Sequence, residues 1–162
     1  MDIAMEFHSL SKTANMTGWR VGFASGNPEM VNALMRVKSN IDSGLSQANQ
    51  EMGIAALDLP SVWVDNNNAV YQKRRDKVVS VLNEIGVPAV APKGALYIWT
   101  PIPEGYTSAE FAQKLLDEVN VVVTPGNGYG PGGEGYIRLS LTIPDDQIDE
   151  GLRRLAQLRV NS

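Results

Sequence analysis

Cysteine is absent from the 162 residues, and histidine occurs only once, as His8. The first absence excludes disulfides and thiolate-bound metals, and the second argues against a histidine-based metal site, so we predict no metal. No apolar run approaches the roughly 18 residues that a membrane-spanning helix requires. Residues 1–12 also lack the charged and apolar regions of a signal peptide. We therefore expect a cytoplasmic globular protein without a membrane partner.

Neither sign of charge dominates the composition. The formal net charge is −4, and hydrophobic residues make up 43% of the chain, which is ordinary for a globular protein. Because nucleic-acid-binding domains are typically basic, we expect no nucleic-acid partner. The acidic residues are dispersed, and no pair of carboxylates stands out for glycosidase-type catalysis.

The first part of the chain predicts two strands and two helices. Apolar and polar residues alternate over 3–8, which indicates a strand, and a second short strand is predicted over 20–24. Residues 27–29 read Asn-Pro-Glu, a combination typical of a helix start. Another helix is expected over 47–57.

A long helix is predicted from Pro60 to about Ile85. Its charged run at 73–77 is interpreted as a solvated face, and Gly86 suits the position after the helix end. The helix is expected because four apolar residues share one face: Tyr71, Val78, Leu82 and Ile85.

The rest of the chain mixes strands and helices without strict alternation, which indicates an α+β unit within a chain of the α/β class. Thr107 and Glu110 form a capping box that begins one helix, and Pro144 precedes the last helix. The apolar stripes of these helices are Phe111, Leu115 and Val119, and Ile148, Leu152 and Leu155. Strands are expected over 87–91, 96–100, 121–124 and 136–141.

Residues 9–12 place two hydroxyls and an amine, Ser9, Ser11 and Lys12, at the end of the first predicted strand, and Arg20 follows shortly after. A lysine that has lost its proton forms Schiff bases with aldehydes, and hydroxyls with a guanidinium bind phosphate. One phosphate-bearing aldehyde, pyridoxal phosphate, uses all of these groups. The alternative is that Lys12 and Arg20 are solvated, as most lysines and arginines are.

The glycine-rich segment 125–133 contains a GxGxxG pattern at Gly128, Gly130 and Gly133. A dinucleotide site needs a helix N-terminus after this loop. Residues 135–141 instead read as a strand, so we reject a Rossmann site. The segment either connects two strands or lets a substrate approach its backbone.

Arg138 lies inside the strand that follows this segment, on the face opposite Ile137 and Leu139. If that face meets solvent, Arg138 is an ordinary surface residue. If it faces a cleft, its guanidinium binds a carboxylate through two hydrogen bonds. The pattern leaves both alternatives open. Trp99 and the other tryptophans are expected to be packing residues.

Several segments together resemble the class I/II aminotransferases of fold type I. Residues 9–13 (SLSKT) and 15–22 (NMTGWRVG) resemble the cofactor-lysine signature of that family, and the resemblance continues at 27–29, 122–126 and 135–140. It covers nearly the whole chain in the right order. The local sequences at 38–44, 105–108 and 133–136 resemble those of the LL-diaminopimelate aminotransferase branch.

The resemblance implies pyridoxal 5′-phosphate as cofactor, an amino acid and a 2-oxo acid as substrates, and a homodimer. Within the branch, the substrates are LL-diaminopimelate and 2-oxoglutarate. Lys12 would hold the cofactor as a Schiff base and then move a proton between the substrate Cα and C4′ of the cofactor. Ser9, Ser11 and Arg20 would bind the phosphate, and Arg138 the substrate α-carboxylate.

Family members are well over twice as long as this chain. The resemblance therefore implies that residues 1–60 are the C-terminal remnant of a large cofactor-binding domain. Residues 61–162 would be the small C-terminal domain, entered by the long helix. Part of the family pattern has no counterpart in this chain. That part carries the aspartate that pairs with the pyridine nitrogen of the cofactor and the aromatic residue that stacks on the cofactor ring. We expect this fragment alone to be inactive; the alternative is a stand-alone, non-catalytic folded unit or interaction module.

Overall fold

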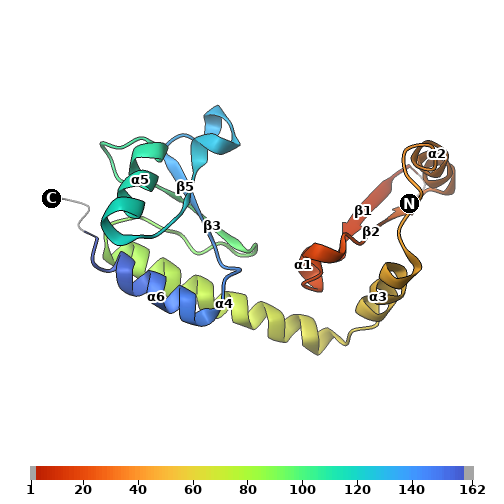
Figure 1. The fold of residues 1–162 in the computed structure, drawn as a ribbon, viewed down its shortest axis with the longest axis horizontal. Coiled ribbons are helices and arrows are strands. Elements are labelled where there is room, and N and C mark those ends of the chain that lie inside the picture. The colour runs from red at the N-terminus through yellow and green to blue at the C-terminus, as the bar shows by residue number, and fades with distance from the viewer. Residues whose placement is uncertain (1–2, 159–162) are drawn as a thin grey trace. The chain divides into compact units, whose positions relative to one another are not determined.

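The computed structural model describes residues 3–158, and the chain divides into two compact units, residues 1–66 and 67–162 (Figure 1). The boundary falls inside the long helix α4 (Ser61–Glu84), which was predicted from Pro60 to about Ile85. None of the helices within residues 3–158 combines the length and the apolar character needed to cross a membrane.

The first unit contains a two-stranded antiparallel sheet. β1 (Met5–Ser9) pairs with β2 (Gly22–Gly26), and α1 (Leu10–Thr13) follows β1 directly, as Figure 1 shows. Both strands were predicted, with ends that differ by about two residues. Gly22 allows the strands to approach, because a Cβ at this position would lie 2.7 Å from the carbonyl oxygen of His8.

Two helices complete the first unit. α2 (Pro28–Lys38) begins as predicted after Asn27, whose side chain accepts hydrogen bonds from the backbone amides of Glu29 and Met30. The prediction of α3 (Gln47–Leu57) is also confirmed. The buried core of this unit is small and consists of Leu10, Met16 and Val21. Phe7 of β1 is 68% exposed, so the apolar face predicted for the first strand is not buried within the described residues.

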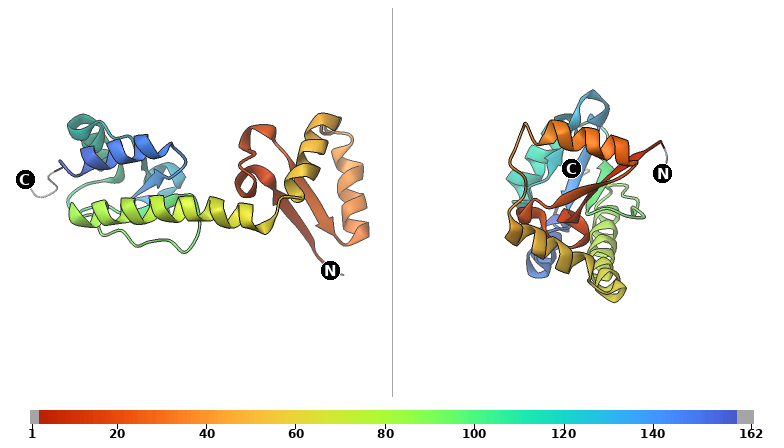
Figure 2. Two further views of the ribbon diagram at one scale, coloured as in Figure 1. Left: turned by 90° about the horizontal axis from the view of Figure 1, so that it is seen from below. Right: turned by 90° about the vertical axis from the view of Figure 1, so that its right-hand side faces the viewer.

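The second unit contains a three-stranded antiparallel sheet in the order β3-β5-β4. Its strands are β3 (Tyr97–Pro101), β4 (Thr124–Pro125) and β5 (Tyr136–Ser140). The core lies between this sheet and three helices, α4, α5 (Ser108–Val119) and α6 (Asp145–Leu155), which Figure 2 shows from two further sides.

The apolar stripes predicted for these three helices are confirmed. Val78 and Leu82 of α4 are buried, and Tyr71 and Ile85 pack against the same core. The capping box of α5 is present, with both reciprocal hydrogen bonds between Thr107 and Glu110. The buried stripe residues of α5 and α6 are those expected from the sequence: Phe111, Leu115, Val119, Ile148, Leu152 and Leu155.

The strand predicted over 87–91 is wrong, because these residues follow α4 as an irregular segment. Val87 and Ala89 are buried, which explains the apolar pattern. The backbone of Ala89 bonds to a side chain instead of a strand: its amide donates to Asn83 Oδ1 at 3.1 Å, and its carbonyl accepts from Asn83 Nδ2 at 3.0 Å. Pro88 also lacks the amide proton that a ladder would require.

The strand predicted over 121–124 is largely wrong as well, because only Thr124 of that range belongs to β4. The amide of Val121 donates to the carbonyl of Leu115 at 3.1 Å and so completes the end of α5. Val122 is 81% exposed. The three consecutive valines at 121–123 have high strand propensity, but within residues 3–158 the pairing of β4 with β5 begins only at Thr124.

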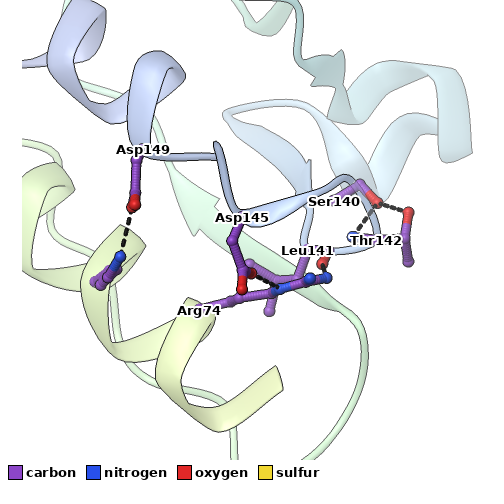
Figure 3. A network of polar contacts seen from close by, with 7 residues as sticks. Arg74, Ser140, Leu141, Thr142, Asp145 and Asp149 are labelled. Atoms are coloured by element: carbon purple, nitrogen blue, oxygen red, sulfur yellow. Dashed lines mark hydrogen bonds and ion pairs between the residues drawn. The ribbon is translucent and has the colours of Figure 1, made fainter. Parts of the chain in front are cut away.

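The charged run 73–77 of α4 is not simply a solvated face. Arg74 donates to the carbonyl of Leu141 at 2.9 Å and to Asp145 at 2.6 Å, as Figure 3 shows. Arg75 donates to the carbonyl of Pro92 at 3.0 Å, and Lys77 pairs with Asp149 of α6. These contacts connect α4 to α6, to the segment before β3 and to the residue after β5, so part of this polar run serves tertiary packing.

Candidate functional site

The first predicted site begins where β1 turns into α1. Ser9 ends the strand and caps the helix, since its Oγ accepts a hydrogen bond from the backbone amide of Ser11 at 3.2 Å. Lys12 follows in the same helical turn, and its side chain is exposed. This strand-to-helix turn places two hydroxyls and an amine within four consecutive residues.

Arg20 is brought to this turn by the segment that follows α1. A short 3₁₀ helix, η1 (Thr17–Trp19), precedes Arg20, and the hydroxyl of Thr17 donates to the carbonyl of Ser11 at 2.9 Å. Arg20 Nη1 in turn donates to the carbonyl of Thr17 at 3.3 Å. Arg20 has a φ of 56°, in the left-handed region, which costs a non-glycine residue on the order of 1 kcal/mol. We define the set Ser9, Ser11, Lys12 and Arg20 as the Lys12 turn.

Helix α3 supports the Lys12 turn from the core side. The amide of Leu10 donates to the carbonyl of Val21 at 3.1 Å, and a Cβ added at Gly53 would lie 3.1 Å from the Val21 side chain. Asn49 of α3 donates to the carbonyl of Trp19 at 3.2 Å. The backbone on both sides of the turn is therefore fixed by contacts that leave Lys12 and Arg20 exposed.

The Lys12 turn contains two basic residues, Lys12 and Arg20. Within residues 3–158, no carboxylate forms an ion pair with Lys12 or Arg20. Hydroxyls and a guanidinium are common ligands of phosphate oxygens. The turn can therefore bind a phosphate-bearing anion while presenting a primary amine next to it.

The second predicted site residue, Arg138, lies in the middle of β5 in the second unit. Its strand neighbours are Trp99 of β3 and Thr124 of β4. Ile137 and Leu139 are buried on the opposite face, as predicted. Arg138 itself is partly buried, and its Nε is fully buried with no hydrogen-bond partner among the described residues.

Aromatic rings surround Arg138. Its Cζ lies 4.2 Å from the ring centroid of Tyr97 and 4.8 Å from that of Tyr129. Trp99 packs edge-on against Tyr129 and stacks on Tyr136, with centroid distances of 5.7 and 5.4 Å. The expectation that Trp99 is a packing residue is confirmed, although it packs on the outer face of the sheet and is 41% exposed.

The glycine-rich segment forms two short 3₁₀ turns, η2 (Gly126–Tyr129) and η3 (Pro131–Gly133), and β5 follows as predicted. The two turns touch where both residues lack a side chain: a Cβ on Gly126 would lie 2.0 Å from the carbonyl oxygen of Gly133. This close approach fixes the loop that carries Tyr129. The segment therefore supplies an aromatic side chain next to Arg138.

Ser108 and Glu134 hold the start of β5. Ser108 is fully buried, and its Oγ accepts hydrogen bonds from the amides of Gly135 and Tyr136 at 2.9 and 3.1 Å. Glu134 Oε1 accepts from the amides of Ser108 at 2.7 Å and Gly135 at 3.1 Å. The hydrogen bond from the Ser108 amide is the main reason that the pKa of Glu134 lies below its ordinary value.

Glu134→Gln should make the chain less stable at neutral pH but not at low pH. A carboxyl whose pKa is lowered by folding stabilises the fold above its ordinary pKa of 4.5, and this stabilisation is lost as the pH falls through the folded pKa. The urea midpoints of the wild type and of Glu134→Gln, measured by circular dichroism, should therefore differ at about pH 7 and converge at about pH 3. Glu104→Gln, which makes the same change at an exposed position, is the comparison variant. A deficit for Glu134→Gln that is constant with pH would contradict the assignment.

Sequence reasoning missed Tyr97 and Tyr129 as neighbours of Arg138. Tyr97 belongs to β3, whose register places it beside Arg138 through the pairs Tyr97–Ser140 and Trp99–Arg138. The available signal was the alternation of β3, which puts Tyr97 and Trp99 on one face. Tyr129 had no comparable signal, because its position depends on the contact between the two glycine turns.

Comparison with known proteins identifies the family. A family model described as aminotransferase class I and II matches residues 2–155. The chain belongs to this family. The resemblance found in the sequence motifs is thereby confirmed.

Curated relatives within this family are similar over almost the whole chain. An LL-diaminopimelate aminotransferase from Dehalococcoides mccartyi is 58% identical over 161 residues, which cover 99% of this chain and 42% of the relative. An enzyme of the same name from Aquifex aeolicus is 48% identical, covering 98% of this chain and 41% of the relative. The chain thus spans about two-fifths of the length of the curated relatives it matches.

Solved structures confirm the mixed α/β fold. An aminotransferase from Staphylococcus aureus matches with a TM-score of 0.87 and 38% identity, covering 97% of this chain and 42% of that one. An aromatic aminotransferase from Pyrococcus horikoshii matches with a TM-score of 0.87 and 32% identity, covering 96% and 42%. An aminotransferase named for aromatic substrates therefore shares this fold.

Proposed function

We propose that this chain is the C-terminal part of a pyridoxal-phosphate-dependent aminotransferase. In this proposal, residues 1–60 belong to its large cofactor-binding domain and residues 61–162 form its small domain. The observation that carries the proposal is the Lys12 turn, in which an exposed lysine follows two hydroxyls and Arg20 is linked to the same turn through Thr17. Membership of the family and the division into two compact units support it.

The residues of the Lys12 turn fit the phosphate and the aldehyde of this cofactor. Ser9, Ser11 and Arg20 would bind the phosphate. Ser9 and Ser11 offer hydroxyls, and Arg20 offers a guanidinium that forms no ion pair with a carboxylate among the described residues. Lys12 would hold the aldehyde carbon through its Nζ. When bound, the cofactor supplies that aldehyde and an electron-withdrawing ring.

Two residues of this chain would act on the substrate. Lys12 would be the base that moves a proton between the substrate Cα and C4′ of the cofactor. Arg138 orients the substrate by binding its α-carboxylate through two parallel hydrogen bonds. The lack of an ion pair with a carboxylate among the described residues leaves the Arg138 guanidinium without a competing counter-ion.

For the substrates we propose LL-diaminopimelate and 2-oxoglutarate. The identity of 58% to a relative named LL-diaminopimelate aminotransferase supports this choice. The fold alone does not, because it also carries an aromatic aminotransferase. A homodimer, as the sequence resemblance implies, and a cytoplasmic location, as expected from the composition, are part of the same proposal.

The full-length protein, meaning the longer protein to which we assign this chain, should transfer the amino group of LL-diaminopimelate to 2-oxoglutarate. The 162-residue chain alone should not, because catalysis requires a cofactor held by a complete supporting shell. Among the described residues of the first unit, the buried apolar cluster consists of Leu10, Met16 and Val21, and Phe7 and Phe23 are exposed. Glutamate formation in a coupled assay is the measurement.

A full-length protein that forms no glutamate from any amino donor would overturn the proposed activity. Activity with other donors but not with LL-diaminopimelate would overturn only the substrate. Comparable turnover by the 162-residue chain would show that the site is complete within these residues.

A further inference from the structure

The environment of Arg138 is unusual for a cation. No carboxylate pairs with it among the described residues, and its Nε is buried without a hydrogen-bond partner. Its close contacts are instead the rings of Tyr97 and Tyr129. Arg74 also lies over a ring, that of Tyr71, but it pairs with Asp145 as well. Arg75 and Arg154 bind the carbonyls of Pro92 and Asn120.

We propose that Tyr97 and Tyr129 are positioning residues that hold the Arg138 guanidinium ready for the substrate carboxylate, an inference that rests on the proposed function. A cation over an aromatic ring is stabilised by about 0.5–2 kcal/mol, depending on its solvation. Contact with ring faces uses no N–H donor of the guanidinium. The donors in the guanidinium plane therefore remain free for two parallel bonds to a carboxylate.

Both rings are themselves fixed by the fold. Tyr97 lies in β3, opposite Ser140 in the strand register. Tyr129 is held by the edge-on contact with Trp99 and by the approach of Gly126 to Gly133. A fixed arginine loses less conformational freedom on binding than a flexible one does, and this difference appears in ligand affinity.

A protein carboxylate would fix Arg138 at least as well, but it would compete with the substrate for the same donors. An aromatic pair holds the side chain without such competition. The arrangement of Arg138 is therefore suited to a residue that must be ordered and still lack a counter-ion before substrate binds.

The test uses the full-length protein with LL-diaminopimelate as varied substrate. Tyr97→Leu and Tyr129→Leu should each raise KM about twofold to thirtyfold with a smaller change in kcat. Tyr97→Phe and Tyr129→Phe retain the ring and should restore most of the affinity. Tyr106→Leu is the matched control, because Tyr106 also lies under a cation, Lys114, and its ring contacts Phe111.

Cofactor absorbance shows whether each variant still folds around its cofactor. Wild-type KM in both leucine variants would overturn the positioning role while the proposed function stands. The role also fails if the phenylalanine variants are as impaired as the leucine variants, or if Tyr106→Leu raises KM equally. Loss of cofactor binding in both leucine variants but not in Tyr106→Leu would assign the rings to folding instead. If the wild-type full-length protein showed no amino transfer, the proposed function itself would be overturned.

Discussion

Replacing Lys12 by alanine in the full-length protein should lower kcat for amino transfer by at least about 10³-fold. The amine of Lys12 is proposed both to hold the cofactor and to move the proton between two carbon atoms. A positioned acid or base alone contributes about 10²- to 10⁴-fold. No second lysine lies in the Lys12 turn to replace it. Steady-state kinetics with saturating cofactor measure the loss.

Lys93→Ala provides the matched control for this prediction. Lys93 is exposed and lies in the segment between α4 and β3, outside the Lys12 turn. Its removal deletes the same amine and the same charge, so the variant should retain wild-type kinetics. A Lys12→Ala protein that keeps more than about a tenth of the wild-type kcat would rule out a direct role for this amine.

Replacing Arg138 by lysine should lower kcat/KM for the amino-acid substrate about 10- to 100-fold, chiefly through KM. Lysine keeps the positive charge but loses the planar pair of donors that binds a carboxylate through two parallel bonds. The Lys12 turn belongs to the first unit, whereas Arg138 belongs to the second. Cofactor absorbance should therefore be retained while the substrate titration shifts to higher concentration.

Arg153→Lys is a suitable comparison for Arg138→Lys. Arg153 lies near the end of α6 and donates two hydrogen bonds to Glu150, both at 2.8 Å. It makes a bidentate contact on an exposed helix, so the same substitution should leave kcat/KM unchanged. If Arg138→Lys also binds substrate as the wild type does, Arg138 is not the carboxylate ligand.

The elements that were predicted correctly are those whose signal is local. The capping box of Thr107 and Glu110 and the cap by Asn27 require only residues within one helical turn. The stripes of α4, α5 and α6 follow from a period of 3.6 residues. The Lys12 turn was also visible, because Ser9, Ser11 and Lys12 are nearly consecutive and their neighbours carry a family signature.

The errors arose where distant residues decide the structure. The segment 87–91 has an apolar pattern, yet Asn83 supplies the hydrogen bonds that a neighbouring strand would otherwise provide. Arg74 was assigned to solvent, although it reaches a carbonyl 67 positions away. The surroundings of Arg138 depend on strand register and on a glycine contact, and neither is encoded near Arg138 in the sequence.

The most direct test of the account is to locate the cofactor on the protein. Full-length protein loaded with pyridoxal phosphate should be reduced with borohydride, which fixes the cofactor to the amine that holds it, and then digested and mapped by mass spectrometry. The account predicts the label on the peptide that contains Lys12. A label on Lys38 or Lys93 instead, with Lys12 unmodified, would contradict it.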